Sequence, residues 1–100
     1  MNAAEIATKA ASLVSGEREQ THGTKVENFD NIAHLWNAWL YVRFGRGINV
    51  WLGGHDVAKL MALLKIARME SGTFNADDFV DCAGYAAIAG ELSQPTETMR

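Results

Sequence analysis

The sequence has few of the residues that mark several large classes of protein. A single cysteine among 100 residues excludes a disulfide framework and any all-cysteine zinc site within one chain. With one proline and 48% apolar residues, the chain is neither collagen-like nor disordered, since a disordered chain buries too little apolar surface. Basic residues are also scarce. Nine lysines and arginines against twelve acids give a net charge of −3, which argues against broad nucleic-acid binding.

The chain also lacks the segments that direct a protein into or across a membrane. No apolar run approaches the about 18 residues that a membrane span needs. The amino terminus has no basic segment followed by an apolar core, so we do not expect secretion. We therefore expect one soluble domain over residues 1–100 in the cytoplasm.

Apolar residues recur at helical spacing in four segments, and no segment favours a sheet. The spacing predicts helices over about residues 3–16, 27–44, 55–70 and 76–92, with a frayed tail over 93–100. The 55–70 helix is apolar on nearly every side and should lie centrally. Asn75 should cap the last helix, with Asp78 in the capping-box position. The predicted fold class is all-α, a four-helix bundle-like domain.

Two further features concern packing. Residues 48–52 have some β character but no partner strand, so we interpret them as an ordered loop held by Trp51. The last helix has a side of small residues that would permit close approach of another helix: Ala83, Ala86, Ala87 and Gly90.

Two acids on the last helix are the first candidates for chemistry. Asp78 and Asp81, at i and i+3, project from one helical face with Cβ atoms about 5–6 Å apart, and Tyr85 shares that face. Two such carboxylates can hold Mg²⁺, which then binds substrate phosphates. The alternative for Asp78 is that the helix dipole alone favours an acid in the first turn.

Cations on the preceding helix are candidates for binding phosphate. Lys65 and Arg68 stand at i and i+3, where they could clamp a phosphate. Alternatively, they are there only because the helix dipole favours cations near the C-terminus. Arg18 and Lys25, in the first connector, could contact an anion or be ordinary solvated residues. Asp56 lies nearly opposite Lys65 on a helical wheel, which disfavours one site that uses both within one chain.

Three tryptophans are more abundant than one short core requires. We interpret Trp36, Trp39 and Trp51 as core or interface residues, and we expect the surplus apolar surface to be buried between subunits of a dimer or higher oligomer.

The last two helices resemble those of the MazG-like all-α nucleotide pyrophosphohydrolases. The resemblance rests on residues 56–60, Lys65, Arg68, residues 78–81 and Tyr85. It implies that Asp78, Asp81 and Asp56 are Mg²⁺ ligands in a protein that cleaves nucleoside triphosphates to monophosphate and pyrophosphate. Lys59 stands where that family has a further acid. A cation there would repel the metal, so this departure favours nucleotide binding over hydrolysis.

Most of the chain is similar to a family of small helical proteins that phages commonly encode. The similarity rests on these positions, with His22 where a tyrosine is expected: Glu17-Arg18, Gly23, Asn28-Phe29, Ile32-Ala33, Leu35-Trp36, residues 56–58, 60–61 and 65–68, Asp81 and residues 83–85. It implies a viral origin, and a protein encoded by a phage is expected in the host cytoplasm.

The sequence leaves three functions open. The first is a protein that binds a nucleotide or another phosphorylated ligand, as a degenerate relative of the pyrophosphohydrolases. The second is a protein-interaction module that inhibits a host or defence protein, which exposed tryptophans would favour. The third is a structural helical oligomer without a small ligand.

Overall fold

The computed structural model describes residues 1–15 and 24–95. Over those residues it contains four helices and no strand: α1 (Ala3–Val14), α3 (Lys25–Phe44), α4 (Gly54–Met69) and α5 (Ala76–Ser93). The predicted all-α class is confirmed, and each helix begins and ends within two residues of its expected position. Among the described residues, no helix is both long enough and apolar enough to span a bilayer.

Polar side chains fix where the helices begin. The Asn2 carboxamide accepts the N–H of Glu5 at 2.8 Å, and the Glu5 carboxylate accepts the N–H of Asn2 at 3.2 Å, which forms a capping box. Asn75 caps α5 as predicted. Its carboxamide oxygen accepts the N–H of Asp77 at 3.0 Å rather than that of Asp78, so the capping box predicted with Asp78 does not form.

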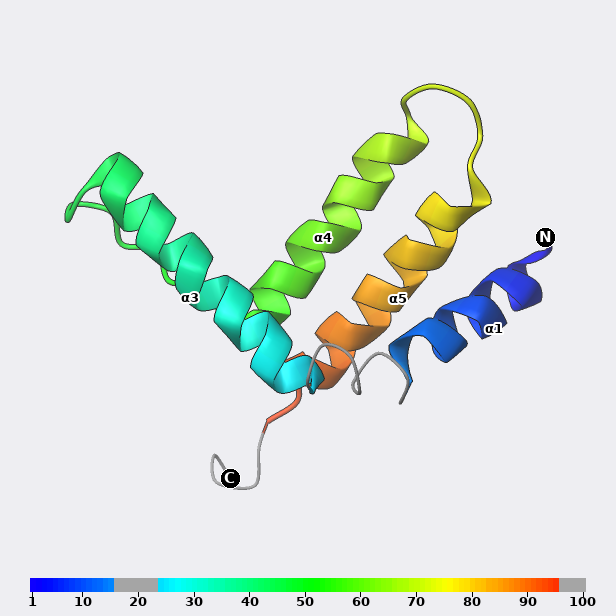
Figure 1. Cartoon of the computed structure of the whole chain (residues 1–100), viewed down its shortest axis with the longest axis horizontal. Helices are drawn as coiled ribbons and strands as arrows, with labels where there is room; N and C mark the ends of the chain where they lie inside the picture. The colour runs from blue at the N-terminus through cyan, green and yellow to red at the C-terminus, as the bar shows by residue number, and fades with distance from the viewer. Residues whose placement is uncertain (16–23, 96–100) are drawn as a thin grey trace.

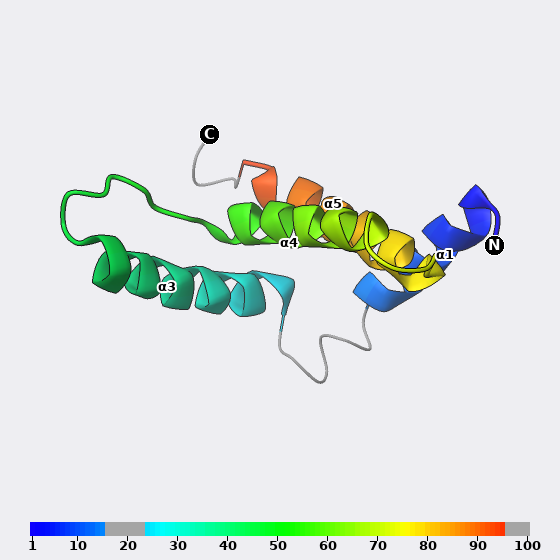
Figure 2. The ribbon, with the colours of Figure 1, turned by 90° about the horizontal axis from the view of Figure 1, so that it is seen from above.

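The helices form an open arrangement rather than a closed bundle. α4 and α5 are an antiparallel pair, and α5 lies between α4 and α1 (Figure 1). α3 lies in a second layer and diverges from α4 along its length (Figures 1 and 2). The radius of gyration is 15.3 Å, above the about 13 Å typical of a 100-residue domain. Much of α3 therefore extends away from the other helices.

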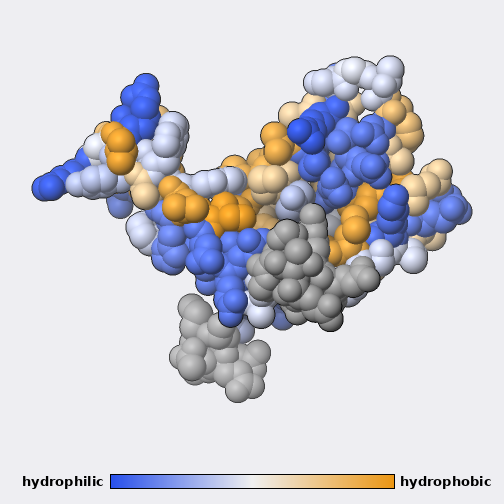
Figure 3. All heavy atoms as spheres, in the orientation of Figure 1, coloured by the Kyte–Doolittle hydropathy of each residue, from blue (hydrophilic) through white to orange (hydrophobic). Residues whose placement is uncertain are grey.

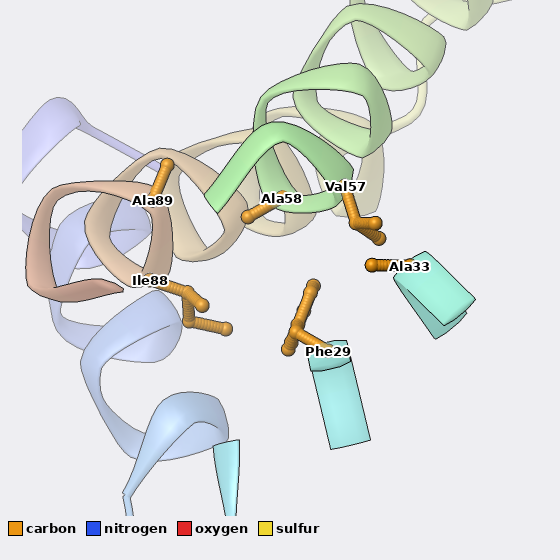
Figure 4. Packing of buried hydrophobic residues seen from close by; sticks show 6 residues of the cluster. All are labelled: Phe29, Ala33, Val57, Ala58, Ile88 and Ala89. Carbon is orange, nitrogen blue, oxygen red and sulfur yellow. The ribbon is translucent and has the colours of Figure 1, made fainter. Parts of the chain in front are cut away.

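The core lies where α3 crosses the start of α4. Figure 4 shows its six members, two from each of α3, α4 and α5: Phe29, Ala33, Val57, Ala58, Ile88 and Ala89. Three of the six are alanines, so the core is thin. The crossing is close at Gly54, where a Cβ atom would lie 2.9 Å from the Asp30 carboxylate and 3.2 Å from the Phe29 Cβ.

The connector between α3 and α4 is held by a residue that the sequence analysis did not single out. Buried Asn37 donates to the carbonyl of Leu52 at 2.9 Å and accepts the N–H of Leu52 at 2.8 Å. Trp51 is 74% exposed, and its ring lies edge-on to the His34 ring, with ring centroids 6.5 Å apart. The expectation that Trp51 holds this loop was therefore wrong, because Asn37 satisfies the backbone instead.

Candidate functional site

Two of the predicted ligand residues bind each other. The Lys65 Nζ lies 3.0 Å from the Asp81 Oδ2, and the two side chains are only 12% and 34% exposed. The pair joins the middle of α4 to α5. Lys65 was expected to bind phosphate and Asp81 to bind metal. In this arrangement each charge neutralises the other.

Asp56 has a structural task at the start of α4. Its Oδ2 accepts the N–H of Gly53 at 2.9 Å, and its Oδ1 lies 3.4 Å from the His55 Nδ1. Nine residues separate Asp56 from Lys65, which is about 13 Å along the helix axis. Asp56 therefore caps α4 at a distance from the Lys65–Asp81 pair.

Among the described residues, the remaining predicted ligand residues form no ion pair with one another. Arg68 is exposed in the last turn of α4, and Asp78 is half-buried in the first turn of α5. Tyr85 packs against the core, edge-on to Phe29 with ring centroids 6.3 Å apart. Arg18 and His22 lie outside the described residues.

Lys25 is not part of a free loop. It is the first residue of α3, and its Nζ lies 3.4 Å from the Val14 carbonyl and 3.7 Å from the Glu91 carboxylate. It joins the start of α3 to the end of α1 and to α5.

The cavity that the described residues form beside Asp81 is too small for a nucleotide. A cavity of about 10 Å³ lies among Asp81, Tyr85 and apolar residues of α1 and α5, and this volume holds at most one water molecule. In the described ranges, 1–15 and 24–95, no three or more histidine, cysteine, aspartate or glutamate side chains cluster where they could hold a metal ion.

Within residues 1–15 and 24–95, the outer side of α3 carries the clearest exposed apolar surface. Leu35, Trp39 and Val42 follow one another at i, i+4 and i+7, so they form a single stripe on the helix. They are 71%, 60% and 81% exposed. We call these three residues the outer α3 stripe. The sequence analysis singled out Trp39 and missed Val42, although the spacing was readable.

The three tryptophans differ in their surroundings. Trp36 is half-buried against the core, Trp39 meets the Phe44 ring edge-on at 6.3 Å, and Trp51 is mostly exposed. Trp36 therefore packs against the core, whereas Trp39 and Trp51 leave apolar surface exposed.

A second apolar surface lies on α4 and α5. Its residues on α4 are Leu60, Leu63, Leu64 and Ala67, at i, i+3, i+4 and i+7, and all are exposed. We call these four residues the α4 leucine stripe. A groove of about 430 Å³ runs between α4 and α5, with walls formed by Lys59, Ala62, Leu63, Ala86, Ala89, Gly90 and Ser93.

These features make the apolar surface large for so small a chain. The predicted small-residue side of α5 faces solvent, since Ala83, Ala86, Ala87 and Gly90 are all exposed. Figure 3 shows apolar residues gathered where α3 meets α4, with polar surface on α3 to one side and on the α4–α5 pair to the other. Monomeric proteins seldom leave so many apolar side chains in water, and such surfaces mark interaction sites.

Comparison with known proteins gives a consistent family. The family described as Domain of unknown function (DUF6378) matches residues 5–93. The chain is 37% identical over 92 residues to the "Gene 55 protein" of Mycobacterium phage L5, a match that covers 92% of this chain and 54% of that protein. It is 36% identical over 93 residues to the "Gene 55 protein" of Mycobacterium phage D29, which covers 92% and 56%.

The chain spans about half the length of these curated relatives. No solved structure matches it. The predicted similarity to a family of phage proteins is confirmed, whereas the resemblance to the MazG-like enzymes stays a prediction. Because the family match covers nearly the whole chain, the protein belongs to the family described as Domain of unknown function (DUF6378).

Proposed function

We propose that the protein is a protein-interaction module that inserts the outer α3 stripe into an apolar groove on another protein. The observation that carries the proposal is the exposure of Leu35, Trp39 and Val42, which are 71%, 60% and 81% exposed at helical spacing. Helices that bind grooves use anchors at this spacing. Tryptophan is also the residue type most enriched among those that dominate binding energy.

The opposite side of α3 holds the stripe in place. Trp36 packs against the core, and Asn37 ties the helix to the connector through two hydrogen bonds to Leu52. A binding helix that is already formed loses little conformational entropy on association. The stripe is therefore a preorganised ligand for a partner protein.

Nucleotide binding has less support than protein binding. A phosphate site would need Lys65 free and a magnesium site would need Asp81 free, and these two residues are paired at 3.0 Å. Asp56 caps α4 through Gly53. Binding of a nucleotide with Mg²⁺ stays a prediction, and it requires these pairs to open.

Site-specific photo-crosslinking in the cells that naturally express the protein tests the proposal. Benzoylphenylalanine in place of Trp39 should give one discrete adduct with a second protein. The matched control places the same probe at Glu27, which is exposed at the other end of α3. The adduct should disappear when Val42→Asp is added. Equal adducts from both positions, or an adduct that survives Val42→Asp, would contradict the proposal.

A further inference from the structure

The α4 leucine stripe is a second exposed apolar surface, separate from the outer α3 stripe. Leu60, Leu63 and Leu64 are 41%, 58% and 45% exposed. A different side of α4 packs in the core, through Ala58 and Met61, and Val57 continues the line of Leu60 and Leu64 into the core. α4 therefore has two apolar sides, and within residues 1–15 and 24–95 only one of them is covered.

Two opposite charges flank this stripe on one side. Lys59 and Glu70 are eleven residues apart, close to three helical turns, so both side chains lie along the same edge of the stripe. Neither forms an ion pair with another residue in the described part of the chain. The polar contact of Lys59 is with the His55 ring, 3.2 Å from its Nζ.

We propose that the α4 leucine stripe binds the same stripe of a second copy, with the two α4 helices antiparallel about a two-fold axis. In that arrangement, one edge of the stripe lies against the same edge of the stripe in the second copy, and the two edges run in opposite chain directions. Lys59 of each copy then faces Glu70 of the other, which gives two intermolecular ion pairs. A parallel arrangement would leave these charges on opposite sides of the seam.

The register of the two features agrees. The stripe runs from Leu60 to Ala67 and the charges from Lys59 to Glu70, so their midpoints on α4 fall within one residue of each other. One two-fold axis can therefore match the leucines and the charges together. This self-complementarity is the reason for choosing a second copy as the partner.

Helix α5 leaves room for the second copy. The groove beside the stripe is walled on the α5 side by small residues, among them Ala86, Ala89 and Gly90. No large α5 side chain lines the groove beside α4, so a partner helix can approach closely.

Sedimentation equilibrium of the purified chain over a wide concentration range tests this inference. The wild type should form a dimer. Leu63→Lys should raise the dimer Kd by roughly tenfold or more, because the two-fold axis repeats the change. Far-ultraviolet circular dichroism should show unchanged helicity. Glu27→Lys, which makes the same change of charge as Glu70→Lys on exposed α3 surface, is the matched control and should leave the Kd unchanged.

Charge exchange tests the antiparallel arrangement independently of folding. Lys59→Glu and Glu70→Lys should each raise the dimer Kd by about threefold to thirtyfold, since each places like charges together twice. An equimolar mixture of the two variants should dimerise like the wild type, because each mixed pair is again opposite in charge. A monomer at every concentration, a dimer unaffected by Leu63→Lys, or a mixture no tighter than either variant would overturn the inference.

Discussion

Asn37→Ala tests how the α3–α4 connector holds the projecting part of α3. Asn37 is 6% exposed and makes two hydrogen bonds of 2.9 Å and 2.8 Å to the backbone of Leu52. Each such bond contributes about 0.5–1.5 kcal/mol net. Alanine removes both, so the free energy of unfolding should fall by about 1–3 kcal/mol. Leu52 is only half-buried, so water can replace part of the loss.

Urea unfolding followed by circular dichroism measures this change. A loss of about 2 kcal/mol, at a slope of about 2 kcal/mol per molar urea, lowers the midpoint by about 1 M. All variants must be compared at one protein concentration, because self-association stabilises the folded chain. Asn49→Ala, an exposed asparagine of the same connector, is the control and should stay within about 0.5 kcal/mol of the wild type. A loss below about 0.5 kcal/mol for Asn37→Ala would refute the reasoning.

Three further predictions concern the pairs and contacts described above. A double-mutant cycle of Lys65→Met and Asp81→Asn in urea unfolding should give a coupling energy of about 1 kcal/mol. This coupling energy should exceed that of a fully exposed ion pair, because the Lys65 side chain is only 12% exposed. A coupling energy near zero would contradict the pairing. Gly54→Ala should lower the melting temperature, since its Cβ would lie 2.9 Å from the Asp30 carboxylate, whereas Gly47→Ala meets nothing within 4 Å and should be neutral. Nucleoside triphosphates with Mg²⁺ should leave the melting temperature unchanged, and a rise abolished by Arg68→Ala would instead support the nucleotide prediction.

The helices were predictable because their signals are local. Alanine-rich runs, capping residues such as Asn75 and breaks at glycine all act within a few neighbouring residues. The role of Asn37 also had a local signal. It continues the spacing of Phe29 and Ala33 on the core side of α3, and a polar residue there must find a partner.

The pairings between helices were not predictable in the same way. Lys65 and Asp81 are sixteen residues apart in the sequence, and their contact depends on how the 70–75 turn sets the register of α4 against α5. The sequence analysis paired Lys65 with Arg68 and Asp81 with Asp78, because each pair has the i, i+3 spacing of two ligands on one helical face. Only the packed arrangement shows that each is the partner of the other.

The sequence predicted that the chain has more apolar residues than one core can bury, but it did not predict where the excess residues lie. A helix apolar on nearly every side predicts a second buried face, and the burial of that face between subunits stays a prediction. The sequence could not show which apolar side chains stay exposed, and the structure places them in the outer α3 stripe and the α4 leucine stripe.

The most direct test of the central claim is the affinity between the purified protein and the partner captured through position 39. Isothermal titration calorimetry of the wild type and of Trp39→Ala would measure it. We predict a loss of about 2 kcal/mol or more for Trp39→Ala, which is roughly thirtyfold in Kd, with Glu27→Ala unchanged. An affinity for Trp39→Ala equal to that of the wild type would contradict a role for the outer α3 stripe in binding.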